Sequence, residues 1–212
     1  MRKSLIISII IVIALFIASF YFYTVLPNTI ITHWNAAGQP NGYMPKLLGN
    51  FLIPITTALL LLLLVFLPKL DPLKKNYKKF ITYYDSFILI FTLFMSFIYI
   101  ISTLWNLGIQ IPINSTILPA VGFLFIYIGI ILRYVKQNWF IGIKTPWTLS
   151  NKKVWDKTHQ LGSTLFIISG IIVIGGVLFP PQYLILFILV PILLSAIFLF
   201  IYSYILYKKT IH

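Results

Sequence analysis

Long apolar runs alternate with short polar segments along the whole chain. A helix rises 1.5 Å per residue, so about 20 residues cross a hydrocarbon layer about 30 Å thick. The first run is longer than the apolar core of a signal peptide, about 7 to 15 residues, and lacks a small-residue cleavage site, so we expect it to be a retained span. Six runs predict membrane-spanning helices: 5–23, 47–67, 85–107, 117–132, 161–179 and 183–207.

Composition favours the same class of protein. The chain is 60% hydrophobic and only 9% charged, and its mean hydropathy of +0.99 exceeds that of a soluble domain of this length. We predict an all-α integral membrane protein, a bundle of six transmembrane helices in the plasma membrane. Pro68 is expected to end the second helix, and Pro191 to kink the sixth. The chain has no cysteine, which excludes disulfides and thiolate metal sites.

The basic residues gather on one side of this predicted topology. Of the 16 Lys and Arg residues, all but Lys46 fall at the two termini or in the segments 68–84 and 133–160, which six spans place on one side. Because Lys and Arg are retained in the cytoplasm, we predict both termini inside. The net charge of +13 therefore indicates topology and attraction to anionic lipids. No nucleic-acid-binding module accompanies it, so direct nucleic-acid binding is not expected.

Ionisable residues are missing from the middle of every predicted span. Proton and ion pathways usually need such groups, so a proton-coupled transporter is disfavoured. Glycines such as Gly122 and Gly129 are expected to permit close helix packing. No catalytic or phosphate-binding motif occurs, and His33 and His159 fall on opposite sides of the membrane, where they cannot share a metal. No catalytic residue, metal or cofactor is expected.

Two polar segments carry most of the candidate chemistry. The segment 24–46 is rich in Pro, Gly and Asn and is predicted to be a loop on the outer side. Within it, Trp34 and its neighbours form either a structured turn with an interfacial anchor or a recognition surface.

The segment 138–163, on the inner side, is the longest polar interval in the chain. Ser150 or Asn151 can cap an amphipathic helix that begins near Lys152. This helix would lie at the membrane interface before the fifth span or run straight into it. Its buried face would hold Val154, Trp155, Thr158, His159 and Leu161. Anchoring is the simpler explanation of the composition, with Trp139, Trp147 and Trp155 in the aromatic belt.

The inner segment, NWFIGIKTPWTLSNKKVWDKTHQLGS, resembles the signature of the sporulation-delaying-protein immunity (SdpI) family, written N-x-x-x-G-I-R-T-P-W-T-L-S followed by V-W-x-x-T-H. Lys144 stands where the family usually has Arg, which keeps the charge but loses the bidentate geometry of a guanidinium. The residues at family positions are Asn138, Gly142, Ile143, Thr145, Pro146, Trp147, Thr148, Leu149, Ser150, Trp155, Thr158 and His159.

The outer segment is similar to the domain of unknown function (DUF1648) that typically precedes the immunity domain. Its pattern is L-P…H-W/F-N…G. The resemblance implies a DUF1648-like region at 1–68 and an SdpI-like immunity domain at 69–212. The matching residues are Pro27, His33, Trp34, Asn35, Gly38 and Gly42.

The resemblance implies a membrane protein that protects its cell against a secreted antimicrobial peptide toxin. In the best-known family system, the immunity protein also senses the toxin and recruits a small DNA-binding repressor to the membrane. His33, Trp34, Asn35 and Gly38 are then candidates to face the toxin, and the inner signature is the candidate output. Two alternatives stay open: a small-solute permease or accessory transport subunit, and a membrane-bound enzyme that uses His33 or His159.

Overall fold

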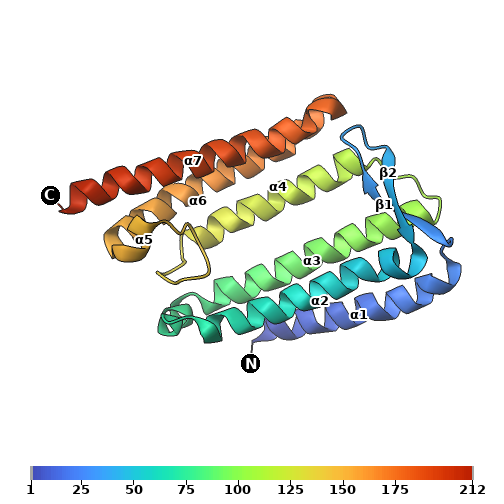
Figure 1. Cartoon of the computed structure of the whole chain (residues 1–212), viewed down its shortest axis with the longest axis horizontal. Coiled ribbons are helices and arrows are strands. Elements are labelled where there is room, and N and C mark those ends of the chain that lie inside the picture. Colours follow the sequence, from blue (N-terminus) through green and yellow to red (C-terminus); the bar gives the residue numbers. More distant parts are fainter. Residues whose placement is uncertain (1, 212) are drawn as a thin grey trace.

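The computed structural model describes residues 2–211 and contains six helices long and apolar enough to cross a membrane, which confirms the predicted number of spans. They run side by side along the long axis of the molecule (Figure 1). The six are α1 (Lys3–Val25), α2 (Lys46–Leu70), α3 (Ile81–Asn106), α4 (Ile113–Leu132), α6 (Lys152–Gly175) and α7 (Leu184–Ile211).

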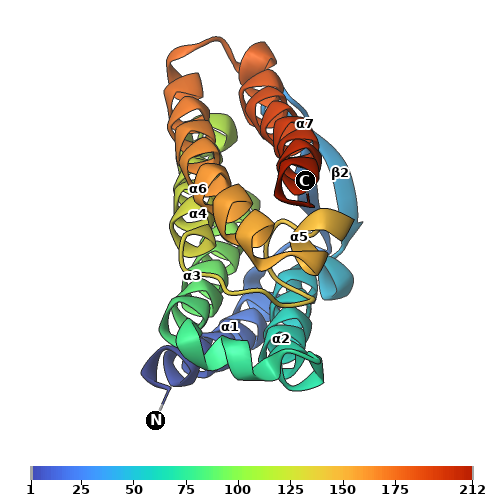
Figure 2. The ribbon, with the colours of Figure 1, turned by 90° about the vertical axis from the view of Figure 1, so that its left-hand side faces the viewer.

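The helices form two groups of three. In one group α1, α2 and α3 pack on one another; in the other, α6 packs between α4 and α7. Helices α3 and α4 join the groups, as Figure 2 shows. Close packing of α4 on α6 depends on glycine, as predicted: a Cβ atom on Gly122 would lie 2.7 Å from the Gly170 carbonyl, and one on Gly129 would lie 2.8 Å from the Ser163 carbonyl.

The sequence predicts that the second helix ends at Pro68, but α2 continues to Leu70. Proline has no amide hydrogen, so it leaves the carbonyl four residues earlier, on Leu64, without its helical donor. The hydroxyl of Tyr84 on α3 donates to that carbonyl at 2.5 Å. The tertiary hydrogen bond compensates for the missing helical one, which explains why the helix tolerates the proline.

The segment between α1 and α2 was expected to be a loop without strands, and this prediction is wrong. Its residues form an antiparallel hairpin of β1 (Thr29–Trp34) and β2 (Pro40–Pro45). The outward edge of β1 is held by α3, because the Asn106 side chain accepts from Ile31 N–H at 2.7 Å and donates to the Ile31 carbonyl at 2.9 Å. An amide side chain thus takes the place of a third strand.

The two ends of the bundle differ in charge and packing. The hairpin lies at one end, called here the hairpin end, while both termini lie at the other, the basic end (Figure 1). The basic end also holds the 3-10 helix η1 (Lys74–Lys79) and the short helix α5 (Pro146–Ser150). A buried cluster that includes Tyr77, Phe80, Tyr84 and Trp155 fills the bundle there. The short turns η2 (Gly176–Leu178) and η3 (Pro181–Tyr183) connect α6 to α7.

Candidate functional site

Asn138 organises the loop between α4 and α5. Its side chain is fully buried, and its Oδ1 accepts from the backbone amides of Phe140 (2.9 Å) and Ile141 (2.7 Å). Its Nδ2 donates to the carbonyls of Lys136 (2.9 Å) and Ile141 (2.8 Å). Both donor hydrogens and the carbonyl are therefore used to fold the loop, so Asn138 has no remaining capacity for a ligand.

The connection between α2 and α3 completes this network, and sequence reasoning missed it. Asp71 is buried, and its Oδ2 accepts from the Trp139 amide at 2.9 Å. The Tyr77 hydroxyl lies 3.2 Å from both Asp71 Oδ2 and Asn138 Oδ1. Burial raises the pKa of the Tyr77 phenol, and Asp71 raises it further, so the phenol stays a donor. The only clue in the sequence was an aspartate placed directly after a span, within a lysine-rich segment.

His159 is buried in α6 and held in one neutral tautomer. Its Nε2 accepts from the Ile143 amide at 2.9 Å, so that nitrogen carries a lone pair. The hydrogen therefore lies on Nδ1, which donates to the Trp155 carbonyl at 2.9 Å. The imidazole stacks on the Trp155 ring at 3.9 Å, with an interplanar angle of 20°. With both nitrogens engaged by the backbone, the histidine is a structural element here rather than an exposed base or ligand.

Gly142 allows the loop to approach that histidine. Its φ of +114° lies in a region that other residues rarely adopt. A Cβ atom would lie 2.3 Å from His159 Nε2. Only glycine therefore fits between the loop and α6 without displacing the imidazole.

Thr145 begins α5 with a capping box that ties this helix to α7. The Thr145 hydroxyl accepts from Thr148 N–H at 3.1 Å, and the Thr148 hydroxyl accepts from Thr145 N–H at 2.9 Å. The Thr145 hydroxyl also lies 3.1 Å from that of Ser203 on α7. Trp147 packs edge-on against Phe200 and tilted against Tyr204, each at 5.0 Å.

The rest of the signature also serves local structure. Asn151 caps α6 by accepting from the amides of Lys153 and Val154. Because α6 continues unbroken from Lys152 to Gly175, the predicted amphipathic helix runs straight into the fifth span instead of forming a separate surface helix. Trp155 is fully buried and donates to the Val135 carbonyl at 3.1 Å, so its predicted place in an aromatic belt is wrong. Three of the remaining positions make local contacts: Lys144 is exposed and donates to the Phe140 carbonyl, Pro146 starts α5, and the Ser150 hydroxyl donates to the Pro146 carbonyl. Leu149 packs on the buried cluster. Thr158 is buried, and its hydroxyl has no partner within residues 2–211.

Two of the four candidate residues in the hairpin, Asn35 and Gly38, stabilise the turn at its tip. Asn35 Oδ1 accepts from the amides of Ala37 (2.9 Å) and Gln39 (3.0 Å). Gly38 adopts a φ of +78°, and the Asn114 side chain at the start of α4 donates to the Ala36 carbonyl at 2.8 Å. These contacts hold the tip over α4.

The other two candidates are placed differently. His33 is exposed, with Nδ1 2.5 Å from the side-chain oxygen of Asn41. Trp34 packs edge-on against Trp105 at 5.8 Å. Its indole Nε1 is buried and has no hydrogen-bond partner within the described part of the chain. The Trp34 donor is the feature at this end that local folding leaves unexplained.

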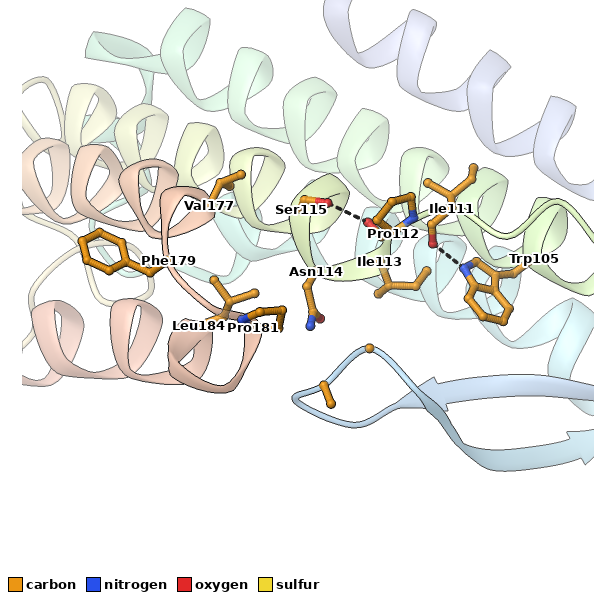
Figure 3. Close-up of a pocket in the computed structure, with 12 residues that line it drawn as sticks. Trp105, Ile111, Pro112, Ile113, Asn114, Ser115, Val177, Phe179, Pro181 and Leu184 are labelled. Carbon is orange, nitrogen blue, oxygen red and sulfur yellow. Dashed lines mark hydrogen bonds between the residues drawn. The ribbon is translucent and has the colours of Figure 1, made fainter.

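Two adjoining cavities lie beneath the hairpin tip. The smaller, of about 180 Å³, lies between Gly38, the α3–α4 turn and the α6–α7 turn (Figure 3). The larger, of about 300 Å³, is lined by Trp34, by α4 and by the start of α7. Ile113, Asn114 and Leu184 line both. The structure thus brings the hairpin candidates to a hollow surface. At the opposite end the signature residues bond mainly to the loop and to neighbouring helices, and a cavity of about 240 Å³ lies beside His159.

No group of three or more His, Cys, Asp or Glu side chains that could hold a metal ion occurs among residues 2–211. His33 and His159 lie at opposite ends of the bundle. Two of the three acidic residues are engaged inside the basic end, since Asp71 accepts backbone amides and Asp85 pairs with Arg2, whose Nε donates at 2.7 Å. The Asp85 hydrogen bond raises the pKa of the Arg2 guanidinium.

Comparison with known proteins extends the resemblance to the whole chain. Residues 134–203 match the SdpI/YfhL protein family, and residues 10–58 match a domain of unknown function (DUF1648). The chain is 31% identical over 209 residues to the immunity protein SdpI of Bacillus subtilis (strain 168), covering 99% of this chain and 98% of that protein. No solved structure matches. With its six spans, this is a multi-pass protein of the plasma membrane, in contact with the lipid bilayer, and it belongs to the SdpI family of immunity proteins.

Proposed function

We propose that this protein protects its cell against a secreted antimicrobial peptide toxin by binding it, without catalysing a reaction. The observation that carries the proposal is the 31% identity to an immunity protein along essentially the full length of both chains. The engaged histidine and carboxylates at the basic end support a role in binding rather than in catalysis.

The hairpin end is the proposed toxin-facing surface, outside the cell. The two termini and the lysine-rich segments meet at the basic end, which by the retention of Lys and Arg faces the cytoplasm. His33 and Trp34 would then lie within reach of a secreted peptide, on a tip that Asn35 and Gly38 keep in shape.

Survival of toxin-sensitive cells tests this function. Cells that express the protein should tolerate a higher concentration of the sporulation-delaying peptide, for which the family is named, than cells with the empty vector. Gly142→Ala serves as a control with less folded protein, because its added methyl group should force the loop away from α6. Equal survival with vector and with folded wild-type protein would show that it gives no immunity to this toxin.

We propose further that the basic end recruits a cytoplasmic transcriptional repressor. Several lysines are exposed there, including Lys144, Lys153 and Lys157, while Asp71 and Asp85 are engaged internally. The surface is therefore suited to a partner with acidic groups. The signature loop contacts the α2–α3 connection, α6 and α7, all within the immunity domain (69–212). Tyr84 of this domain donates to the Leu64 carbonyl of the DUF1648-like region (1–68), and we propose that toxin binding is transmitted between these two parts.

Charge reversal separates recruitment from immunity. Lys153→Glu combined with Lys157→Glu changes two exposed residues of α6 and should release a fluorescent repressor of the family type from the membrane, while survival in toxin stays as in wild type. Lys46→Glu, at the hairpin end, is the matched control and should leave the repressor at the membrane. Unchanged membrane recruitment in the double variant would contradict this assignment of the surface.

A further inference from the structure

The cavities under the hairpin extend from the surface into the apolar part of the bundle. The larger one is lined by Ile113 and Val121 of α4, which are eight residues or about 12 Å apart along a helix. On α7 it is lined by Leu184 and Ile188. Its roof is polar and comes from the hairpin and Asn114. Anything that fills it must therefore place apolar groups within the outer part of the membrane.

The charge at this end restricts the occupant. Lys46 is the one Lys or Arg in the segments 26–46, 107–112 and 176–183, and those segments contain no Asp or Glu. All three acidic residues of the chain are at the basic end. A cationic group would find no carboxylate partner here, so the surface is complementary to an uncharged, apolar ligand rather than to a basic one.

Trp34 specifies a polar feature of that ligand. A buried indole N–H usually has an acceptor, because leaving it without one costs about 1 to 3 kcal/mol. Trp34 lines the larger cavity, and its Nε1 is buried without a partner in residues 2–211, so an oxygen of a ligand in the cavity reaches this donor when the indole turns toward it. Trp105 beside it differs, because its indole donates to the Ile111 carbonyl at 2.6 Å. Of these two neighbouring indoles, Trp34 is therefore the one without an acceptor within residues 2–211.

We propose that this cavity binds an uncharged, apolar stretch of a membrane-inserted peptide, whose carbonyl or hydroxyl oxygen accepts a hydrogen bond from Trp34 Nε1. At about 300 Å³ the cavity accommodates a few side chains but not a whole helix, which is about 10 Å across. The inference rests on the proposed immunity function and adds the binding site and the chemistry of its ligand.

Two substitutions test the site by separate means. Trp34→Phe keeps an aromatic ring but removes the donor, and should weaken binding of the sporulation-delaying peptide about five- to tenfold. Ile117→Trp places a larger side chain in the cavity wall and should weaken binding at least tenfold. The matched controls are Trp139→Phe, an exposed indole at the basic end, and Leu193→Trp, an exposed position on α7; both should bind as wild type.

A label in an otherwise unaltered cavity provides a measurement that does not depend on those variants folding. Because the chain has no cysteine, Ile185→Cys allows a single environment-sensitive fluorophore in the lining, and Leu193→Cys a control outside it. In proteoliposomes, the sporulation-delaying peptide should shift the emission at 185 and leave it unchanged at 193.

The outcomes distinguish the two proposals. If wild-type protein gives no survival advantage, the immunity function fails, and this inference fails with it. If wild type protects while Trp34→Phe and Ile117→Trp protect equally well, the immunity function stands and the cavity is not the binding site. An emission shift at 185 that appears on transfer from detergent into proteoliposomes, with no further change on adding peptide, would show that a lipid chain fills the cavity and would overturn the proposal.

Discussion

Asn138→Ala should destabilise the protein more than any exposed substitution, because it removes a buried side chain with four hydrogen bonds to the backbone. Alanine leaves two amides and two carbonyls without these partners. At about 1 kcal/mol for each bond, with some replacement by water, the free energy of unfolding should fall by about 3 to 4 kcal/mol. For a chain of this size, that corresponds to a fall in melting temperature of roughly 10 °C.

Thermal unfolding in detergent, followed by fluorescence-detected size-exclusion chromatography, measures this effect. Asn138→Asp keeps the size and the acceptor oxygen but turns the two N–H donors toward Lys136 and Ile141 into acceptors, so it should be at least as destabilising. Gln160→Ala is the matched control, since it removes an exposed side-chain amide from α6 at the same, basic end of the bundle. It should change the melting temperature by less than about 2 °C. If Asn138→Ala behaved like this control, the hydrogen-bond network would not stabilise the loop.

Three further substitutions test other features. Gly142→Ala should lower stability by about 3 kcal/mol or more, because its φ is +114° and its Cβ would overlap the buried imidazole; an unchanged melting temperature would refute this. Arg2→Gln should lower the free energy of unfolding by about 1 to 3 kcal/mol, because it leaves the Asp85 carboxylate unpaired, and adding Asp85→Asn should recover much of that loss. If the effects of the two substitutions simply added up in the double variant, the ion pair would not contribute to stability. For the orientation, a membrane-impermeant maleimide should label Asn41→Cys in intact cells but Lys153→Cys only after permeabilisation; the reverse pattern would invert the topology.

The hairpin shows why a local pattern misled the sequence-based prediction. Proline, glycine and asparagine indicated a loop, and they do occupy the tip and the ends of the strands, at Asn35, Gly38, Pro40 and Pro45. A two-stranded hairpin in water is marginal on its own. Here Asn106, 75 residues away, bonds the outward edge of β1 at Ile31. That contact is tertiary, and nothing in residues 29–45 encodes it.

The signature loop was located by sequence but its role was not. Its residues were recognised from their spacing, and both helix caps follow from local residue types, Thr145 with Thr148 for α5 and Asn151 for α6. Anchoring tryptophans were also predicted, and Trp139 is exposed. Trp155 is fully buried instead, because its face of α6 packs against the loop and the α2–α3 connection.

The sequence by itself determined the class of protein, the six spans and the gathering of basic residues at one end, because hydrocarbon thickness and local hydropathy fix these features within single segments. Only the tertiary structure decided that Tyr77 meets Asn138 across 61 residues and Asp71 meets Trp139 across 68. It also decided that Trp34 lies beside a cavity formed with α4 and α7 and that its indole donor has no partner among residues 2–211. Hydrogen-bond partners and empty space depend on how helices distant in sequence pack, which no local pattern specifies.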